Sequence, residues 1–101
     1  MWSPMKTEVV DRPDRERYEI KADGELAGFV DYTLAPGTIT FTHTEIDGSF
    51  EGKGVGSALV RQALDDVRER ELTVSPVCPF VKKWIERHPD HLDLVHRPTG
   101  G

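Results

Sequence analysis

Glu51-Gly52-Lys53-Gly54-Val55-Gly56-Ser57 is the stretch of this sequence that decides the fold. Its three glycines alternate with other residues, after an alternating β pattern over Thr38–Ile46 and before a strongly helical pattern. Glycine adopts positive φ without a Cβ penalty and lets the backbone approach a ligand closely. A helix that begins after such a loop directs free N–H groups and its positive dipole end at one place. The stretch therefore predicts a strand–loop–helix unit that binds a phosphate or diphosphate.

Two familiar glycine loops do not fit this stretch. A P-loop would need glycine where Asp47 stands and serine or threonine where Gly54 stands. The dinucleotide fingerprint would need a third glycine at Ser57, and 101 residues are too few for a doubly wound dinucleotide domain. The loop therefore belongs to another kind of phosphate site.

The residues before the loop predict an antiparallel β meander. A short edge strand is expected over residues 7–10, followed by strands over 18–22, 25–34 and Thr38–Ile46. Asp23-Gly24 is a strong hairpin signal, and Pro36-Gly37 fits a type II turn. Alternation predicts that one face of the third strand carries Leu26, Gly28, Val30, Tyr32 and Leu34. By the same rule, one face of the fourth strand carries Ile39, Phe41, His43 and Glu45, with threonines on the other face.

The residues after the loop predict a helix, a strand and a second helix. The first helix has an apolar stripe of Val55, Leu59, Val60, Ala63, Leu64 and Val67. A strand over 72–74 should run parallel to the strand before the loop, because a helix connects them. Pro79 opens the second helix, whose apolar face is built from Phe80, Val81, Trp84 and Ile85. A last strand is expected over 92–95. The predicted fold class is α/β, with a mixed sheet.

Composition sets the broad class. The 101 residues are expected to form a single domain, 1–101, in which 1–6 and 97–101 are loose tails. No apolar stretch approaches the roughly 18 residues that would span a membrane, and Met1 begins no signal peptide. A single cysteine suits a reducing cytoplasm. A net charge of −5 argues against nucleic acid as a partner and would favour a cationic, amine-bearing substrate.

Three segments in order carry a resemblance to a known family. They are His43-Thr44-Glu45-Ile46, the loop pattern Glu51-x-x-Gly54-x-Gly56, and Cys78-Pro79-Phe80-Val81 followed by His88-Pro89. Over residues 17–95 the chain resembles the GNAT acyltransferase superfamily, in particular its minimal single-domain members with a Cys-Pro-Phe motif. The resemblance implies a trimmed GNAT fold, whose sheet splays where the strand before the loop leaves the strand after the helix. The pantetheine arm of coenzyme A lies in that cleft in the family.

The resemblance also implies an activity and a set of site residues. It implies an acetyl-CoA-dependent N-acetyltransferase that acts on a primary amine of a small molecule or peptide. The diphosphate would be held by Gly52, Lys53, Gly54, Val55, Gly56 and Ser57, and the pantetheine by the backbone at Ile46. Glu45 and His43 would line the cleft, where either could accept a proton. The family usually has arginine or glutamine at position 51, so the Glu51 side chain is expected to point away from the diphosphate.

Cys78 has several possible roles. It precedes Pro79 and is expected at the N-cap of the second helix, where free N–H groups and the dipole favour a thiolate. It could protonate the departing thiolate of coenzyme A, carry the acyl group itself, or simply fill space in the core. Tyr18 and Tyr32 both precede the loop, so the late-helix tyrosine of larger relatives has no counterpart. Direct transfer in a ternary complex is preferred, because no base is evidently dedicated to activating the thiol.

Two other functions stay open at this point. A non-catalytic module that binds coenzyme A or acyl-CoA would need the loop but neither Cys78 nor Glu45. A thiol hydrolase using Cys78 and a histidine would leave the glycines unexplained. A metal site is not expected, because the spacing of His88, His91 and His96 matches no zinc pattern. The sequence identifies neither the acyl acceptor nor the oligomeric state, which could be monomer or homodimer.

Overall fold

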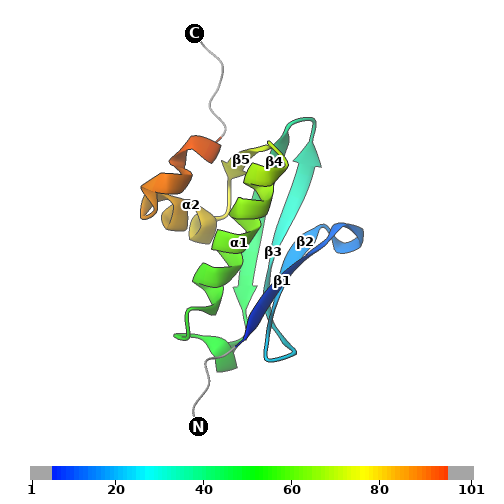
Figure 1. Cartoon of the computed structure of the whole chain (residues 1–101), viewed down its shortest axis with the longest axis vertical. Helices are drawn as coiled ribbons and strands as arrows, with labels where there is room; N and C mark the ends of the chain where they lie inside the picture. The colour runs from blue at the N-terminus through cyan, green and yellow to red at the C-terminus, as the bar shows by residue number, and fades with distance from the viewer. Residues whose placement is uncertain (1–5, 96–101) are drawn as a thin grey trace.

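A five-stranded mixed sheet with both α-helices on one face makes up this computed structural model (Figure 1). The structure describes residues 6–95, so Trp2 and His96 lie outside the described part. The elements in chain order are β1 Thr7–Arg12, η1 Pro13–Arg15, β2 Arg17–Ala22, β3 Glu25–Ala35, β4 Thr38–Ile46, η2 Gly48–Phe50, α1 Val55–Glu69, β5 Thr73–Pro76, α2 Pro79–Glu86 and η3 Pro89–Leu94.

The strands lie side by side in chain order, β1-β2-β3-β4-β5. The first four are antiparallel and β5 is parallel to β4, which confirms the α/β class and the meander followed by helix–strand–helix. The predicted turns are present: Asp23 and Gly24 have φ of 50° and 86°, and Gly37 has φ of 77°. Lys6, expected in a loose tail, exchanges hydrogen bonds with Asp23, so it belongs to the folded part.

The core lies between the sheet and the two helices. The six residues predicted for the stripe of α1 are all buried, which confirms the helical periodicity. From α2, Val81, Trp84 and Ile85 join the same core cluster. The sheet contributes Tyr18, Ile20, Val30, Tyr32, Ile39 and Phe41. Burial of such side chains stabilises the fold by about 1.5–3 kcal/mol for each large aliphatic residue.

Strand β4 runs on after its pairing with β5 has ended. The parallel register extends from Thr38 opposite Thr73 to Phe41 opposite Pro76, and the Cys78 amide then donates to the Phe41 carbonyl at 2.8 Å. Beyond Phe41, β4 continues to Ile46, while the segment that follows β5 turns away into α2. This confirms the predicted splay of the sheet, and it opens one edge of β4 next to the glycine loop.

A β-bulge at Thr42 reverses the faces of β4. Asp31 pairs with His43 but Tyr32 pairs with Phe41, which leaves Thr42 as the extra residue of β4. After an extra residue, each side chain points to the opposite face from the one that simple alternation predicts. The prediction that His43 and Glu45 share a face with Ile39 and Phe41 is therefore wrong. Their side chains are 58% and 63% exposed on the other face of the sheet.

A second bulge has the same effect in β3. Ile20 pairs with Gly28 and Lys21 with Leu26, so Ala27 is the extra residue. Ala27 is fully buried while Leu26 is 47% exposed, contrary to the predicted alternation. Leu34 is also exposed, because it lies near the β3–β4 turn, where the hairpin ends in solvent.

The C-terminal part differs from the predicted strand. Residues 89–94 form the 3-10 helix η3, and only Val95 makes a parallel bridge, with Val74. Pro89 at the first position of η3 explains the difference, since its fixed φ and missing N–H suit a helical start.

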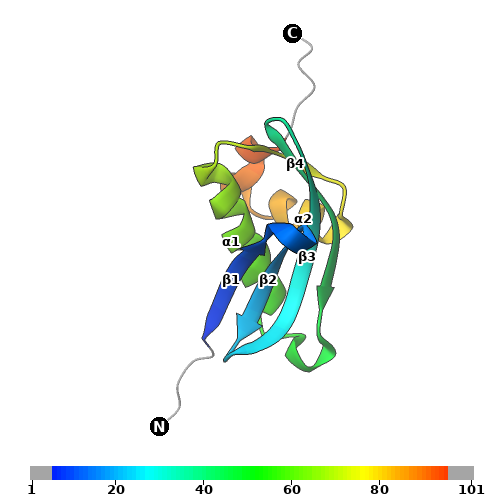
Figure 2. The same ribbon diagram turned by 90° about the vertical axis from the view of Figure 1, so that its right-hand side faces the viewer.

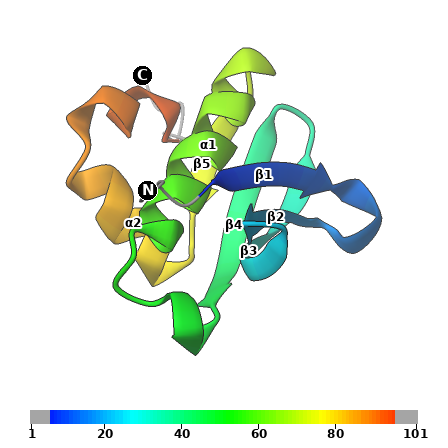
Figure 3. The ribbon, with the colours of Figure 1, turned by 60° about the horizontal axis from the view of Figure 1, so that its bottom comes forward.

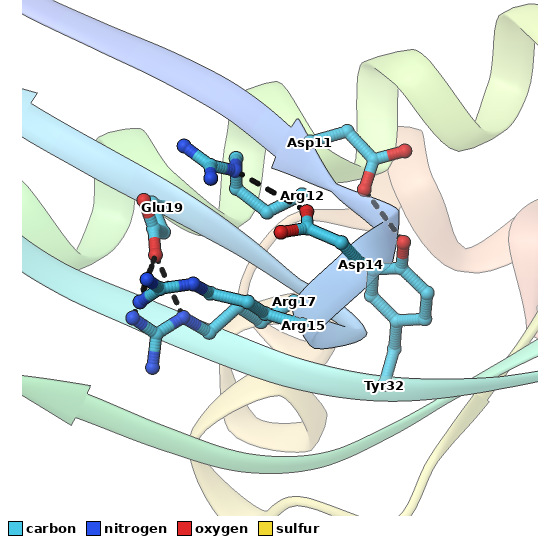
Figure 4. Close-up of polar contacts among 7 residues, drawn as sticks. All are labelled: Asp11, Arg12, Asp14, Arg15, Arg17, Glu19 and Tyr32. Atoms are coloured by element: carbon cyan, nitrogen blue, oxygen red, sulfur yellow. Dashed lines mark hydrogen bonds and ion pairs between the residues drawn. The ribbon is translucent and has the colours of Figure 1, made fainter.

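The face of the sheet opposite α1 and α2 carries no α-helix among the described residues (Figure 2). Polar and aromatic side chains from the strands lie there instead. The nearly buried Glu19 accepts hydrogen bonds from Arg17, and Arg15 lies 4.0 Å away (Figure 4). The Arg17 guanidinium lies 4.4 Å from the centre of the Phe29 ring, which in turn lies 6.4 Å from the His43 ring. We call this surface the open face.

Candidate functional site

The loop between β4 and α1 begins with a capped turn. The Asp47 carboxylate accepts hydrogen bonds from the Ser49 amide, at 2.9 Å, and from the Ser49 hydroxyl. These bonds hold the pKa of Asp47 below its ordinary value. The turn positions the chain for the glycines that follow.

Two of the three glycines adopt the left-handed backbone conformation, which glycine accepts more readily than other residues. Gly52 and Gly54 have φ of 78° and 76°, and Gly54 is the N-cap of α1. In the first α-helical hydrogen bond of α1, the Ala58 amide donates to the Gly54 carbonyl oxygen at 3.0 Å. The amides of Val55, Gly56 and Ser57 precede it and have no carbonyl one turn earlier to bind. The predicted loop-to-helix geometry is therefore present, and diphosphate binding by it is the remaining prediction.

Gly56 has a different reason to be glycine. A Cβ on Gly56 would lie 2.7 Å from the Cζ atom of Phe80, so the small residue lets α2 pack against the first turn of α1. Next to it, the Ser57 hydroxyl oxygen accepts a hydrogen bond from the Trp84 indole N–H at 2.9 Å. The hydroxyl proton of Ser57 remains able to donate. Figure 3 shows α1 and α2 meeting at this end of the molecule.

A pocket of about 360 Å³ lies at this place, which we call the loop pocket. It is lined by Thr44, Ile46, Phe50, Glu51, Gly52, Gly54, Val55, Gly56, Ser57 and Phe80. All the residues predicted to hold the carrier are in this set except Lys53, whose ammonium group lies 5.9 Å from the centre of the Phe50 ring. Glu51 is part of the lining, and the direction of its carboxylate away from a diphosphate stays a prediction.

The open edge of β4 borders the same pocket. The Asp47 amide donates to the Ala27 carbonyl at 2.8 Å, so the peptide groups of alternate residues before it also face β3. The peptide groups of Thr44 and Ile46 consequently point the other way, into the space that β5 has left. This edge offers an N–H and C=O pattern to which an extended amide-containing ligand can bind as an added strand.

Cys78 and Thr44 meet beside this edge. Cys78 is the N-cap residue of α2, as predicted, and its Sγ atom lies 3.2 Å from Thr44 Oγ1. Cys78 is only 3% exposed and is not among the residues that line the loop pocket. Thr44, which does line it, belongs to the segment expected in the cleft, but the sequence reasoning gave its side chain no role. A signal existed: Ile46 is out of phase with Ile39 and Phe41, which indicates an extra residue between them.

His43 and Glu45 form a pair on the open face. The Nε2 atom of His43 lies 3.2 Å from Glu45 Oε2, and both side chains are more than half exposed. The structure therefore brings the two residues together but places them across β4 from the loop pocket. Their role as proton acceptors stays a prediction.

The histidines after α2 take part in packing. The His88 ring stacks on Trp84 with a centroid distance of 3.7 Å, and its Nδ1 atom lies 2.6 Å from the Trp84 carbonyl oxygen. His91 pairs with Asp65 at 3.1 Å and meets the edge of Trp84. Within residues 6–95, no three histidine, cysteine or acidic side chains are grouped so that they could hold a metal ion. In that same part of the chain, no helix is long and apolar enough to cross a membrane.

A mixed sheet that parts after a bulge, next to a glycine loop that opens a helix, defines the acyltransferase fold of the GNAT class. The sequence comparison agrees with the geometry. The model of the family described as GCN5-related N-acetyl-transferase matches residues 17–94, and the chain belongs to this family.

Individual relatives are distant. Protein NATD1 of Xenopus tropicalis is 31% identical over 52 residues, which are 52% of this chain and 48% of that protein. The chain thus spans about half the length of this relative. NATD1 of Danio rerio is 24% identical over 80% of this chain and 77% of its own length. Streptothricin acetyltransferase of Streptomyces lavendulae is 39% identical over 59% of this chain and 33% of its own length.

Solved structures share the fold. A GCN5-like protein from Staphylococcus aureus superposes with a TM-score of 0.69 at 20% identity, covering 90% of this chain and 89% of its own. A ribosomal-protein-alanine N-acetyltransferase from Brucella melitensis superposes with a TM-score of 0.57 at 15% identity, covering 98% and 96%. At these identities the likeness concerns the fold alone.

Proposed function

We propose that this protein is an N-acetyltransferase that transfers the acetyl group of acetyl-CoA to a primary amine. The observation that carries the proposal is the loop pocket, where the first-turn amides of α1 converge with two glycines of positive φ. Such amides, together with the helix dipole, stabilise a diphosphate without needing a basic side chain. Diphosphate binding would therefore not require Lys53, which lies outside the lining, and would be compatible with Glu51 within it.

The rest of the carrier would follow β4. The pantetheine arm contains amide groups, and the peptide groups of Thr44 and Ile46 point toward the position it would occupy. A β4 amide at this edge would also donate a hydrogen bond to the thioester carbonyl oxygen as negative charge develops there. The reacting carbon would then lie near the Thr44–Cys78 pair, where β4 and β5 part.

The proposed reaction is direct transfer in a ternary complex. The neutral amine nitrogen would attack the thioester carbonyl carbon, so that a C–N bond forms and the C–S bond breaks. The thiolate of coenzyme A would take up the proton that the nitrogen loses as the amide forms, directly or through water. Before the attack, Glu45 would accept a proton from the ammonium form of the substrate, directly or through water. Because Glu45 lies on the open face, the amine would approach from that face, along the part of β4 that is not paired with β5. The acidic net charge of the chain favours a cationic acceptor.

The structure gives no support to the thiol hydrolase alternative. The Sγ atom of Cys78 is buried against Thr44, and no histidine within residues 6–95 is hydrogen-bonded to it. The alternative of a non-catalytic module that binds acyl-CoA would need the same loop pocket as the proposed enzyme, so only a measurement of turnover distinguishes the two functions. A panel of primary amines incubated with acetyl-CoA measures that turnover.

Calorimetric titration with coenzyme A and acetyl-CoA tests the proposal, using Gly54→Asp with Gly54→Asn as the matched control. Asn and Asp have similar size and both tolerate the left-handed backbone that Gly54 adopts, so the two variants differ mainly in charge. A carboxylate at the start of α1 should weaken binding at least tenfold relative to the amide, a difference of about 1.4 kcal/mol. Failure of the wild-type protein to bind either ligand, or equal binding by both variants, would sink the proposal.

A further inference from the structure

A second pocket adjoins the loop pocket and is lined by residues of both α1 and α2. Its volume is about 320 Å³, and it is lined by Ser57, Phe80, Lys83, Trp84, Arg87 and His88. Ser57 and Phe80 line both pockets, so the two pockets are adjacent where α1 and α2 meet. None of the residues that line the second pocket is acidic. We call it the α2 pocket.

The arginines around the α2 pocket differ from the other arginines within residues 6–95, whereas no lysine in that part of the chain forms an ion pair. Arg12, Arg15, Arg17, Arg68 and Arg70 each form an ion pair with a carboxylate. Within residues 6–95, neither Lys83 nor Arg87 nor the neighbouring Arg61 has such a partner. In a chain with a net charge of −5, a pocket with unpaired cations and no carboxylate is suited to an anion.

The floor of the α2 pocket is aromatic and well held. The Trp84 indole is nearly buried, with its N–H bonded to Ser57, and the His88 ring lies almost parallel to it, at an interplanar angle of 10°. The guanidinium of Arg61 lies 5.4 Å from the centre of the Trp84 ring. Phe80 is 42% exposed at the border with the loop pocket. Aromatic rings held in this way offer a planar heterocycle a surface to stack on.

We propose that the α2 pocket binds the nucleotide end of coenzyme A, and that Lys83 and Arg87 recognise the phosphate monoester on its ribose. This inference rests on the proposed function, because it extends the carrier from the loop pocket across Ser57. The purine would stack against the aromatic side chains, while the Ser57 hydroxyl donates to the diphosphate between the two pockets. Lys83 and Arg87 then distinguish coenzyme A from its 3′-dephospho form, because only the former carries the additional dianion.

Binding of coenzyme A and 3′-dephospho-coenzyme A to the wild-type protein and to a Lys83→Ala/Arg87→Ala variant tests this inference. The wild-type protein should prefer coenzyme A by about tenfold or more, the usual effect of charge-assisted hydrogen bonds to phosphate. The double variant should lose this preference while its Kd for the dephospho form stays within about twofold. Lys82→Ala is the matched control, because Lys82 is an exposed cation on the same helix that does not line the pocket. It should keep the preference.

Fluorescence gives a second readout that needs no turnover. The chain has two tryptophans, so a Trp2→Phe variant leaves Trp84 as the only indole reporter. Adenosine 3′,5′-bisphosphate should change the Trp84 emission and compete with coenzyme A, whereas 4′-phosphopantetheine should leave the emission unchanged.

The outcomes separate the two proposals. If the wild-type protein binds coenzyme A but the double variant keeps the preference, the α2 pocket is not the nucleotide site and the proposed function stands. Equal weakening of both ligands in the double variant also overturns the inference, since it indicates a general electrostatic effect. A wild-type protein that binds neither ligand overturns both proposals.

Discussion

The Sγ atom of Cys78 lies 3.2 Å from the Oγ1 atom of Thr44, at the point where β4 and β5 part. The contact joins the N-cap of α2 to the strand that borders the loop pocket. It exists because the bulge at Thr42 turns Thr44 toward the helices. The neutral Thr44 hydroxyl therefore covers the thiol and shields it from solvent. Unlike a base, this hydroxyl does not activate the thiol as a nucleophile.

Cys78 should therefore not carry an acetyl group. We expect intact-mass measurement after incubation with acetyl-CoA, without acceptor, to show no adduct on the protein. Cys78→Ala should keep most of the single-turnover acetylation rate and lose about 1 kcal/mol of unfolding free energy, because it leaves a small cavity. An acetyl thioester on Cys78 would show instead that transfer has two steps.

Glu45 should affect turnover without affecting carrier binding. Its carboxylate lies on the open face, across β4 from the loop pocket, so Glu45→Gln should leave the Kd for coenzyme A within about twofold. Loss of a general base should lower kcat by about 100-fold. His43→Gln is the companion variant and should have a smaller effect if Glu45 accepts the proton. Weaker carrier binding by Glu45→Gln would contradict the placement of its carboxylate.

Gly28 should be among the positions in β3 that do not tolerate alanine. A Cβ there would lie 2.6 Å from the Glu45 carbonyl oxygen and 2.6 Å from Ile46 Cδ1. Because one of these atoms belongs to the backbone, relief requires movement of β4, and Gly28→Ala should cost about 1–3 kcal/mol in urea denaturation. Gly48→Ala is the control, since a Cβ on Gly48 meets nothing within 4 Å. Equal stability of the two variants would contradict the close approach of β3 and β4.

A network of polar contacts between α1 and the sheet predicts how the stability of the protein changes at alkaline pH. The Tyr18 hydroxyl donates to Asp66 and the Tyr32 hydroxyl to Asp11, each at 2.6 Å, and Arg70 pairs with both carboxylates. Burial first, and then the bonded carboxylate, raises the pKa of each phenol above its ordinary value.

Stability should therefore fall as the pH rises above about 10, the pKa of an unfolded tyrosine. In that range the unfolded phenol loses its proton while the folded one keeps it, so the unfolded state binds fewer protons and is favoured. Urea denaturation between pH 8 and about pH 11 should show this loss in the wild-type protein. The Tyr18→Phe/Tyr32→Phe variant should show a shallower decline, and identical slopes would argue against raised pKa values for the phenols.

Local patterns predicted most of the fold. The stripe of α1 is visible as a periodicity of about 3.6 residues, and the turns at Asp23-Gly24 and Pro36-Gly37 follow from the few residues that adopt positive φ. The parallel β5 follows from chain connectivity alone. These features depend on neighbours in sequence, so the sequence records them directly.

The faces of the strands could not be predicted in the same way. Ala27 and Thr42 are the extra residues of the two bulges, and neither is a residue type that marks a bulge. The phase change between Phe41 and Ile46 indicates an extra residue in β4, but the position of each bulge depends on how three strands pack at once. For the same reason, the α2 pocket escaped the sequence analysis, since it requires α1 and α2 to be placed against each other.

The bulge at Thr42 also affects how substitutions in this chain should be compared with those in its relatives. Along β4, the side chains that face the helices belong to odd-numbered residues up to Phe41 and to even-numbered residues from Thr44 onward. These positions should tolerate substitution least. An alignment that places a gap on the wrong side of this point would exchange pocket-facing residues for solvent-facing ones without altering the identity score by much. Gain or loss of a single codon here would be a larger evolutionary step than several point changes elsewhere in the strand.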